Sequence, residues 1–149
     1  MKYRCFSRQF IVLLLLALAM LISACDRNSG PTPEEIQAVK AVMEKRAVAI
    51  RNKDIEMYKD VFLKDYDDGR GNYQMIVAEM AENFRLYDTI EFTYQRSPVD
   101  LTMNSARMVG NVSYKTNRMQ KPVFDHEITL FRRVDGQWYI SGGMAIGLF

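Results

Sequence analysis

The sequence predicts an α+β fold in which three N-terminal helices pack on a curved antiparallel sheet of about four strands. Two observations support this prediction. Apolar residues between Ile36 and Phe84 recur every three or four positions, which is the period of helices that bury one face. From Leu86 onward the period changes to two, as in strands that bury one face. Helices followed by strands favour a single sheet with helices on one side.

Local signals place the three helices. Thr32 can cap the first, Pro33 suits its first turn and Glu35 completes a capping box, so this helix is expected over residues 33–52. Asp54 can cap a second, shorter helix, which ends at the polar loop 64–72. A third helix is expected over 73–85. The apolar stripes comprise Ile36, Val39, Met43, Ala47 and Ile50, then Ile55, Tyr58, Val61 and Phe62, then Ile76, Val77, Met80 and Phe84.

The strands are predicted from alternation. Residues 86–96 form the first, and Ser97-Pro98 marks a bend before residues 99–103, because proline cannot donate to a ladder. Alternation resumes over 106–115, and a final hairpin turns at Asp135-Gly136. We assign even-numbered residues to the inward face throughout, including His126 in the last hairpin. The inward apolar residues are then Ile90, Phe92, Tyr94, Met108, Val112, Tyr114, Ile128, Leu130, Trp138 and Ile140.

The first 24 residues have the organisation of an export signal. Three basic residues precede thirteen consecutive apolar residues, 10–22, and the small residues Ser23-Ala24 follow. A thirteen-residue helix would reach only about 20 Å, short of the roughly 30 Å of a bilayer core. The stretch Ile22-Ser23-Ala24-Cys25 resembles the lipobox of bacterial lipoproteins. The resemblance implies a signal peptide over 1–24, a lipidated tether over 25–32 and a folded domain over 33–149. The alternative is an ordinary secretory signal that leaves Cys25 as a free thiol.

Lipidation of Cys25 would anchor the mature protein to the cell membrane, because several buried acyl chains make anchoring effectively permanent. Asp26 resembles the signal that keeps lipoproteins of enteric-type bacteria on the inner membrane, so we expect the periplasmic, extracytoplasmic face of that membrane.

Loss of the leader also removes three of the 20 basic residues and none of the 18 acidic ones, which leaves a net charge of −1. With no basic cluster remaining, no nucleic-acid partner is expected. Cys5 leaves with the leader, and one histidine without cysteine ligands makes no recognisable metal site, so neither metal nor cofactor is expected.

The folded domain resembles the nuclear transport factor 2-like superfamily, whose cystatin-like cone is shared by polyketide cyclases, ketosteroid isomerase, scytalone dehydratase and many binding domains. The resemblance rests on the first helix running into Asn52-Lys53-Asp54, on the turn and strand at 104–110, and on the hairpin at 128–140. It implies a cone whose open end holds a largely apolar pocket, and homodimers formed through the sheet. None of these segments is a catalytic motif, and fold does not fix function.

Seven residues are candidates for such a pocket: Tyr58, Phe62, Asp88, Tyr94, Tyr114, His126 and Trp138. The aromatic residues could line a ligand site or simply fill the core. His126 could carry protons at the pocket mouth, or lie hydrogen-bonded and wet near a strand end. Asp88 is the nearest equivalent of the pocket carboxylate of the isomerases, or else a solvated turn residue.

Because no catalytic constellation is evident, the leading hypothesis is a lipid-anchored, non-enzymatic module that binds a small apolar ligand or another envelope protein. A competing hypothesis is an isomerase, dehydratase or cyclase that uses general acid–base chemistry in the cone. A third is a structural homodimer, which predicts an apolar patch on the outer sheet face around Val109 and Phe131.

Overall fold

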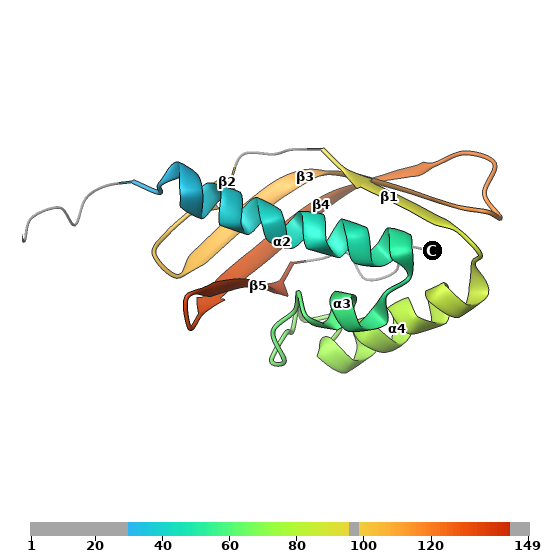
Figure 1. Cartoon of the computed structure of the whole chain (residues 1–149), viewed down its shortest axis with the longest axis horizontal. Coiled ribbons are helices and arrows are strands. Elements are labelled where there is room, and N and C mark those ends of the chain that lie inside the picture. The colour runs from blue at the N-terminus through green and yellow to red at the C-terminus, as the bar shows by residue number, and fades with distance from the viewer. Residues whose placement is uncertain (1–29, 96–98, 144–149) are drawn as a thin grey trace, which may run out of the picture. The chain divides into compact units, whose positions relative to one another are not determined.

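The computed structural model describes residues 30–95 and 99–143 (Figure 1). The leader, Cys25 and Asp26 lie outside the described residues, as do Ser97-Pro98 and residues 144–149. Three helices come first: α2 (Pro33–Asn52), α3 (Ile55–Lys59) and α4 (Tyr73–Leu86). In the part of the chain that the structure describes, no helix is long and apolar enough to cross a membrane.

Helix α2 begins and ends at the signals that the sequence contains. The Thr32 hydroxyl accepts from the amide of Glu35 at 3.2 Å, and the Glu35 carboxylate accepts from the amide of Thr32 at 3.0 Å, so the capping box is present. At its C-terminus Lys53 adopts a left-handed conformation with φ 56°, which reverses the chain. Asp54 then caps α3 by accepting from the amide of Met57 at 2.9 Å.

Five strands follow: β1 (Ile90–Tyr94), β2 (Val99–Leu101), β3 (Ser105–Thr116), β4 (Val123–Val134) and β5 (Gln137–Gly142). They form one antiparallel sheet in the order β1-β3-β4-β5, and β2 also pairs with β3. The segments β1 and β2 thus lie along opposite halves of β3, on either side of the predicted bend. The helices followed by a curled antiparallel sheet confirm the predicted α+β fold (Figure 1).

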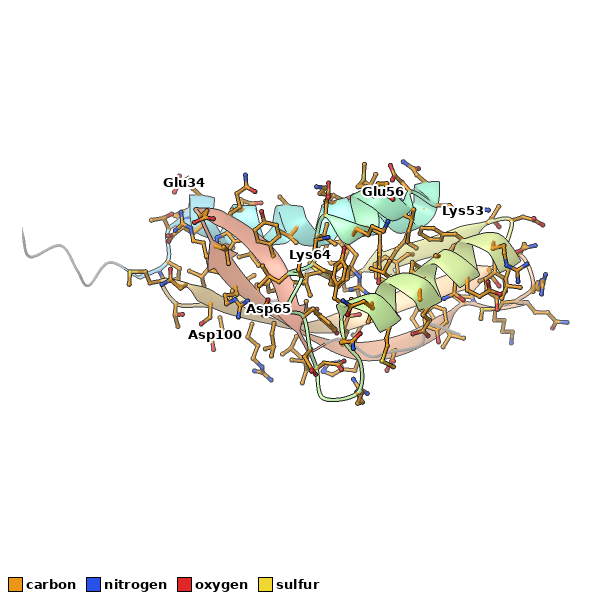
Figure 2. All side chains as sticks on the ribbon, turned by 90° about the horizontal axis from the view of Figure 1, so that it is seen from below. Glu34, Lys53, Glu56, Lys64, Asp65 and Asp100 are labelled. Atoms are coloured by element: carbon orange, nitrogen blue, oxygen red, sulfur yellow. The ribbon has the colours of Figure 1, made fainter. Side chains whose placement is uncertain are left out.

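The core lies between α2 and the inner face of the sheet. The stripe of α2 that contains Val39, Met43, Ala47 and Ile50 is fully buried, as predicted. On the sheet, Phe92 and Ile140 have no exposed surface. Figure 2 shows Glu34, at the start of α2, and Asp100, on β2, at the same end of the domain, with Lys53 at the other end. Helix α2 therefore runs along much of the sheet that it covers.

The predicted register of β4 is wrong. Its odd-numbered residues Glu127, Thr129 and Phe131 are buried, whereas the even-numbered His126, Ile128 and Leu130 are exposed. The reason is the pairing with β3, which joins Met108 to Thr129 and Ala106 to Phe131, so that even residues of β3 share a face with odd residues of β4. The expected patch residue Phe131 consequently lies in the core, 1% exposed.

Both lateral edges of the sheet are partly covered. The amide of Ile140 on β5 donates to the carbonyl of Val61 at 2.8 Å, and its carbonyl accepts from the amide of Leu63 at 3.0 Å. On the opposite edge, Nη1 of Arg51 donates to the carbonyl of Phe92 on β1 at 3.3 Å. The amide and carbonyl of Ile140 and the carbonyl of Phe92, which edge strands could leave open, are thus hydrogen-bonded to other parts of the chain.

Candidate functional site

The interior of the cone contains a buried ion pair that joins α2 to β4. Arg46 is 1% exposed and Glu127 is 4% exposed. Nη1 of Arg46 lies 2.6 Å from Oε1 of Glu127, and Nη2 lies 3.3 Å from Oε2, which is a two-point contact. Arg46 occupies the same buried face of α2 as Met43 and Ile50, so its guanidinium has no route to solvent and must find its partner inside.

Neighbouring side chains complete the cluster around the ion pair. The hydroxyl of Thr129 donates to Oε1 of Glu127 at 2.7 Å, and the guanidinium carbon of Arg46 lies 4.9 Å from the centre of the Phe92 ring. Among the described residues, Nε of Arg46 is the one buried side-chain nitrogen or oxygen atom without a hydrogen-bond partner. The pair is therefore largely but not fully satisfied.

Burial and charge act in opposite directions on the ionisable groups of this cluster. Burial alone lowers the pKa of Arg46, but the charge of Glu127, with smaller contributions from Tyr58 and Tyr66, raises it above its ordinary value. Burial raises the pKa of Tyr58 to about 12, although the positive charge of Arg46 opposes this shift. At neutral pH Tyr58 is therefore a neutral phenol beside a permanently charged guanidinium.

The residues that the structure describes leave little free space beside this cluster. A cavity of about 10 Å³ lies next to Glu127 and Thr129 and is also lined by Met43, Tyr94, Gln95, Met108, Gly110, Asn111 and Val112. That is roughly the space that one water molecule needs. In this part of the cone, side chains occupy the volume that an organic ligand would require.

Most aromatic residues predicted for the pocket are core residues. Tyr58 and Phe62 are 2% exposed, and their ring centres lie 4.8 Å apart. Phe84 and Tyr66 extend the same aromatic cluster. Trp138 is also buried, whereas Tyr94 and Tyr114 are partly buried. The structure thus favours core filling over ligand binding for Tyr58, Phe62 and Trp138.

The two candidate catalytic residues lie far apart on the surface. His126 is exposed, contrary to its predicted inward position, and its Nδ1 lies 3.0 Å from Oδ1 of Asn111. Asp88 is exposed in the turn before β1 and accepts from Nδ2 of Asn117 at 2.9 Å. Asn111 and Asn117 are six residues apart along β3 and its end, which corresponds to about 20 Å at the rise of a strand. His126 and Asp88 therefore form no acid–base pair.

Sequence analysis did not single out Arg46 or Glu127. One signal was available for Arg46, because it stands three residues after Met43 and four before Ile50, at the spacing of the buried stripe. For Glu127 no such signal was available, because its neighbours His126 and Ile128 do not show which face of β4 is buried. Its burial follows from the register of β4 against β3. No group of three or more potential metal ligands occurs among the described residues.

The outer face of the sheet carries an apolar row along β4. Phe124 is 70% exposed, and Ile128 and Leu130 are each 40% exposed. Val134 continues the row, and Val109 on β3 pairs directly with Ile128. We call Phe124, Ile128, Leu130, Val134 and Val109 the outer apolar row. A pocket of about 290 Å³ opens on the same face beside Leu130.

No protein-family model and no curated protein matches this chain in sequence. Solved structures do resemble it. A cystatin-like protein of unknown function from Nostoc punctiforme has a TM-score of 0.65 at 11% identity, with 76% of this chain and 91% of that chain covered. A nuclear transport factor 2-like protein of unknown function from Pseudomonas putida has a TM-score of 0.66 at 15% identity, with 76% of this chain and 86% of that chain covered. A protein from Novosphingobium aromaticivorans, named as a proposed aromatic ring hydroxylase, has a TM-score of 0.65 at 19% identity, with 80% of this chain and 93% of that chain covered.

These likenesses show the fold: the described domain has the nuclear transport factor 2-like, cystatin-like architecture that the sequence predicted. At such low identity they assign no activity to this chain. The most distinctive features of this chain are the buried Arg46–Glu127 pair and the apolar residues exposed on the outer face of the sheet.

Proposed function

We propose that this protein is a lipid-anchored, non-enzymatic binding module of the cell envelope. The observation that carries the proposal is the Arg46–Glu127 pair, which with Thr129 and the core aromatics occupies the interior of the cone. A small ligand in that space would have to break a desolvated, two-point ion pair. Binding by the outer face of the sheet requires no such rearrangement, and that face exposes the outer apolar row.

The competing proposal, general acid–base catalysis, has little geometric support. It would require His126 and Asp88 to share a site, and they are held by Asn111 and Asn117 at separate points along β3. We therefore expect no turnover of steroid-like or polyketide-like ketones. Turnover by the purified protein that Asp88→Asn or His126→Ala abolishes would contradict the proposal.

Cys25 is expected to be the residue that carries the acyl chains. In bacterial cells, mass spectrometry of the wild-type protein should find an N-terminal peptide that begins at Cys25 and carries fatty acyl chains. Cys25→Ser should abolish the acylated peptide, because serine offers no thiol to modify. Cys5→Ser is the matched control and should leave acylation unchanged, since Cys5 lies in the leader.

An unmodified Cys25 in the wild-type protein would contradict the anchoring proposal. Membrane fractionation tests the location, and Asp26 favours recovery with the inner membrane. Finding the acylated protein only in the outer membrane would remove that part of the proposal.

A second copy of this chain is one partner that the outer apolar row favours, since the exposed Phe124 and Ile128 can bury themselves against a symmetry mate and leave Leu130 at the edge of the interface. We expect the wild-type protein to sediment as a dimer. Ile128→Asp should raise the dissociation constant by about tenfold or more, because it places an unpaired charge in the interface. Met75→Asp, at an exposed position of α4, is the control and should not change it.

A monomeric wild-type protein at tens of micromolar would contradict self-association. An equal effect of the two aspartate substitutions would place the interface elsewhere.

A further inference from the structure

The pocket beside Leu130 opens on the outer face of the sheet, and residues of β2, β3, β4 and β5 line it. We call it the outer pocket; its volume is about 290 Å³, and it is lined by Asp100, Thr102, Ser105, Ala106, Arg107, Leu130, Phe131, Arg132 and Ser141. Its position coincides with the shift in register between Leu130 and Phe131, where β4 pairs with Gly142 of β5. A bulge bends the strand locally and redirects the side chains beside it.

The two arginines of the outer pocket differ in whether a carboxylate of this chain already binds their guanidinium. Arg132 is already engaged, because its Nη2 lies 2.6 and 2.5 Å from the two carboxylate oxygens of Asp65. Figure 2 shows Asp65 in the loop beside β5. The side chain of Arg107 makes no hydrogen bond or ion pair with any residue that the structure describes, although Asp100 is its direct neighbour across the β2–β3 pairing. One guanidinium thus remains available to an incoming anion.

The rest of the outer pocket favours a singly charged ligand with an apolar part. Leu130 offers 40% of its surface, and the lining also includes Ala106 and Phe131. The Asp100 carboxylate repels ligands with two negative charges more strongly than those with one. The hydroxyl of Ser141 adds a polar group on the β5 side. The volume, near the lower end of the roughly 300–1,000 Å³ of small-molecule sites, excludes large ligands.

We propose that the outer pocket binds a monocarboxylate with a short apolar chain, with Arg107 holding the carboxylate and Leu130 contacting the chain. This inference rests on the proposed function, since it names a ligand class for the same outer face. The carboxylate would accept a charge-assisted hydrogen bond from Arg107, and the chain would cover apolar surface that water now contacts.

The test is a methyl-NMR titration of the full mature protein in phosphatidylcholine nanodiscs. Hexanoate is the probe; hexanol lacks the charge and inorganic phosphate lacks the chain. We expect saturable shifts of the Leu130 and Ala106 methyl groups with hexanoate at millimolar concentrations, and binding about tenfold weaker with hexanol or phosphate. Arg107→Gln should weaken hexanoate binding by about tenfold. Lys115→Gln, on the same face of the same strand, should leave it unchanged.

Equal binding of hexanoate and hexanol, or an unaltered affinity in Arg107→Gln, would overturn the assignment of Arg107. If no methyl group shifts, the outer pocket proposal fails while the proposed function stands. If the shifts appear instead at Thr129 and Met43, the ligand enters the cone, and the proposed function fails as well.

Discussion

Glu127→Ala is expected to lower the free energy of unfolding by about 3–5 kcal/mol, because it leaves the guanidinium of Arg46 buried without its counter-charge. Urea denaturation followed by circular dichroism measures the change. The double variant Arg46→Met, Glu127→Leu should recover most of the loss, since well-packed apolar residues of similar volume replace a buried pair at little cost. The coupling between the two sites then follows from the double-mutant cycle.

The matched control for this series is Glu82→Ala, which removes the partner of Arg85 from an exposed ion pair on α4. Its unfolding midpoint should stay close to that of the wild type, because solvent screens exposed pairs. If Glu127→Ala and Glu82→Ala had similar effects, the Arg46–Glu127 pair would be accessible to water, and the argument for a filled cone would be lost.

Phe92→Ala is expected to lower the free energy of unfolding by about 3–5 kcal/mol, because it empties a fully buried position on β1. The loss includes the contact between the Phe92 ring and the guanidinium of Arg46. Met103→Ala is the control: truncation of a side chain that is 78% exposed and lies outside the outer apolar row should change stability by less than about 0.5 kcal/mol. Equal effects of the two substitutions would place Phe92 outside the core.

Sequence reasoning predicted best where the signals are local. Thr32, Pro33 and Glu35 lie within four positions of one another, and the helix begins where they place it. The change of period at Leu86 likewise depends on neighbouring residues, and α4 ends there before β1 begins. The α+β fold class and the order of the elements followed from such local patterns.

The register of β4 could not be predicted in this way. Apolar residues occur on both of its faces, with Ile128 and Leu130 outside and Phe131 inside, so alternation within the strand does not decide which face is buried. The pairing with β3 decides it. Arg46 and Glu127 are 81 residues apart in the chain, and their contact depends on this register. The candidate site therefore required the three-dimensional structure.

The proposed lipid anchor would concentrate this protein on a membrane surface, and there the covered edges of the sheet would matter. Molecules tethered to one membrane meet often, and open strand edges would then join them into growing ribbons of sheet. Here Ile140 is hydrogen-bonded to the segment that follows α3, and the carbonyl of Phe92 accepts from Arg51. The proposed association through side chains on the sheet face would then form closed pairs instead of polymers.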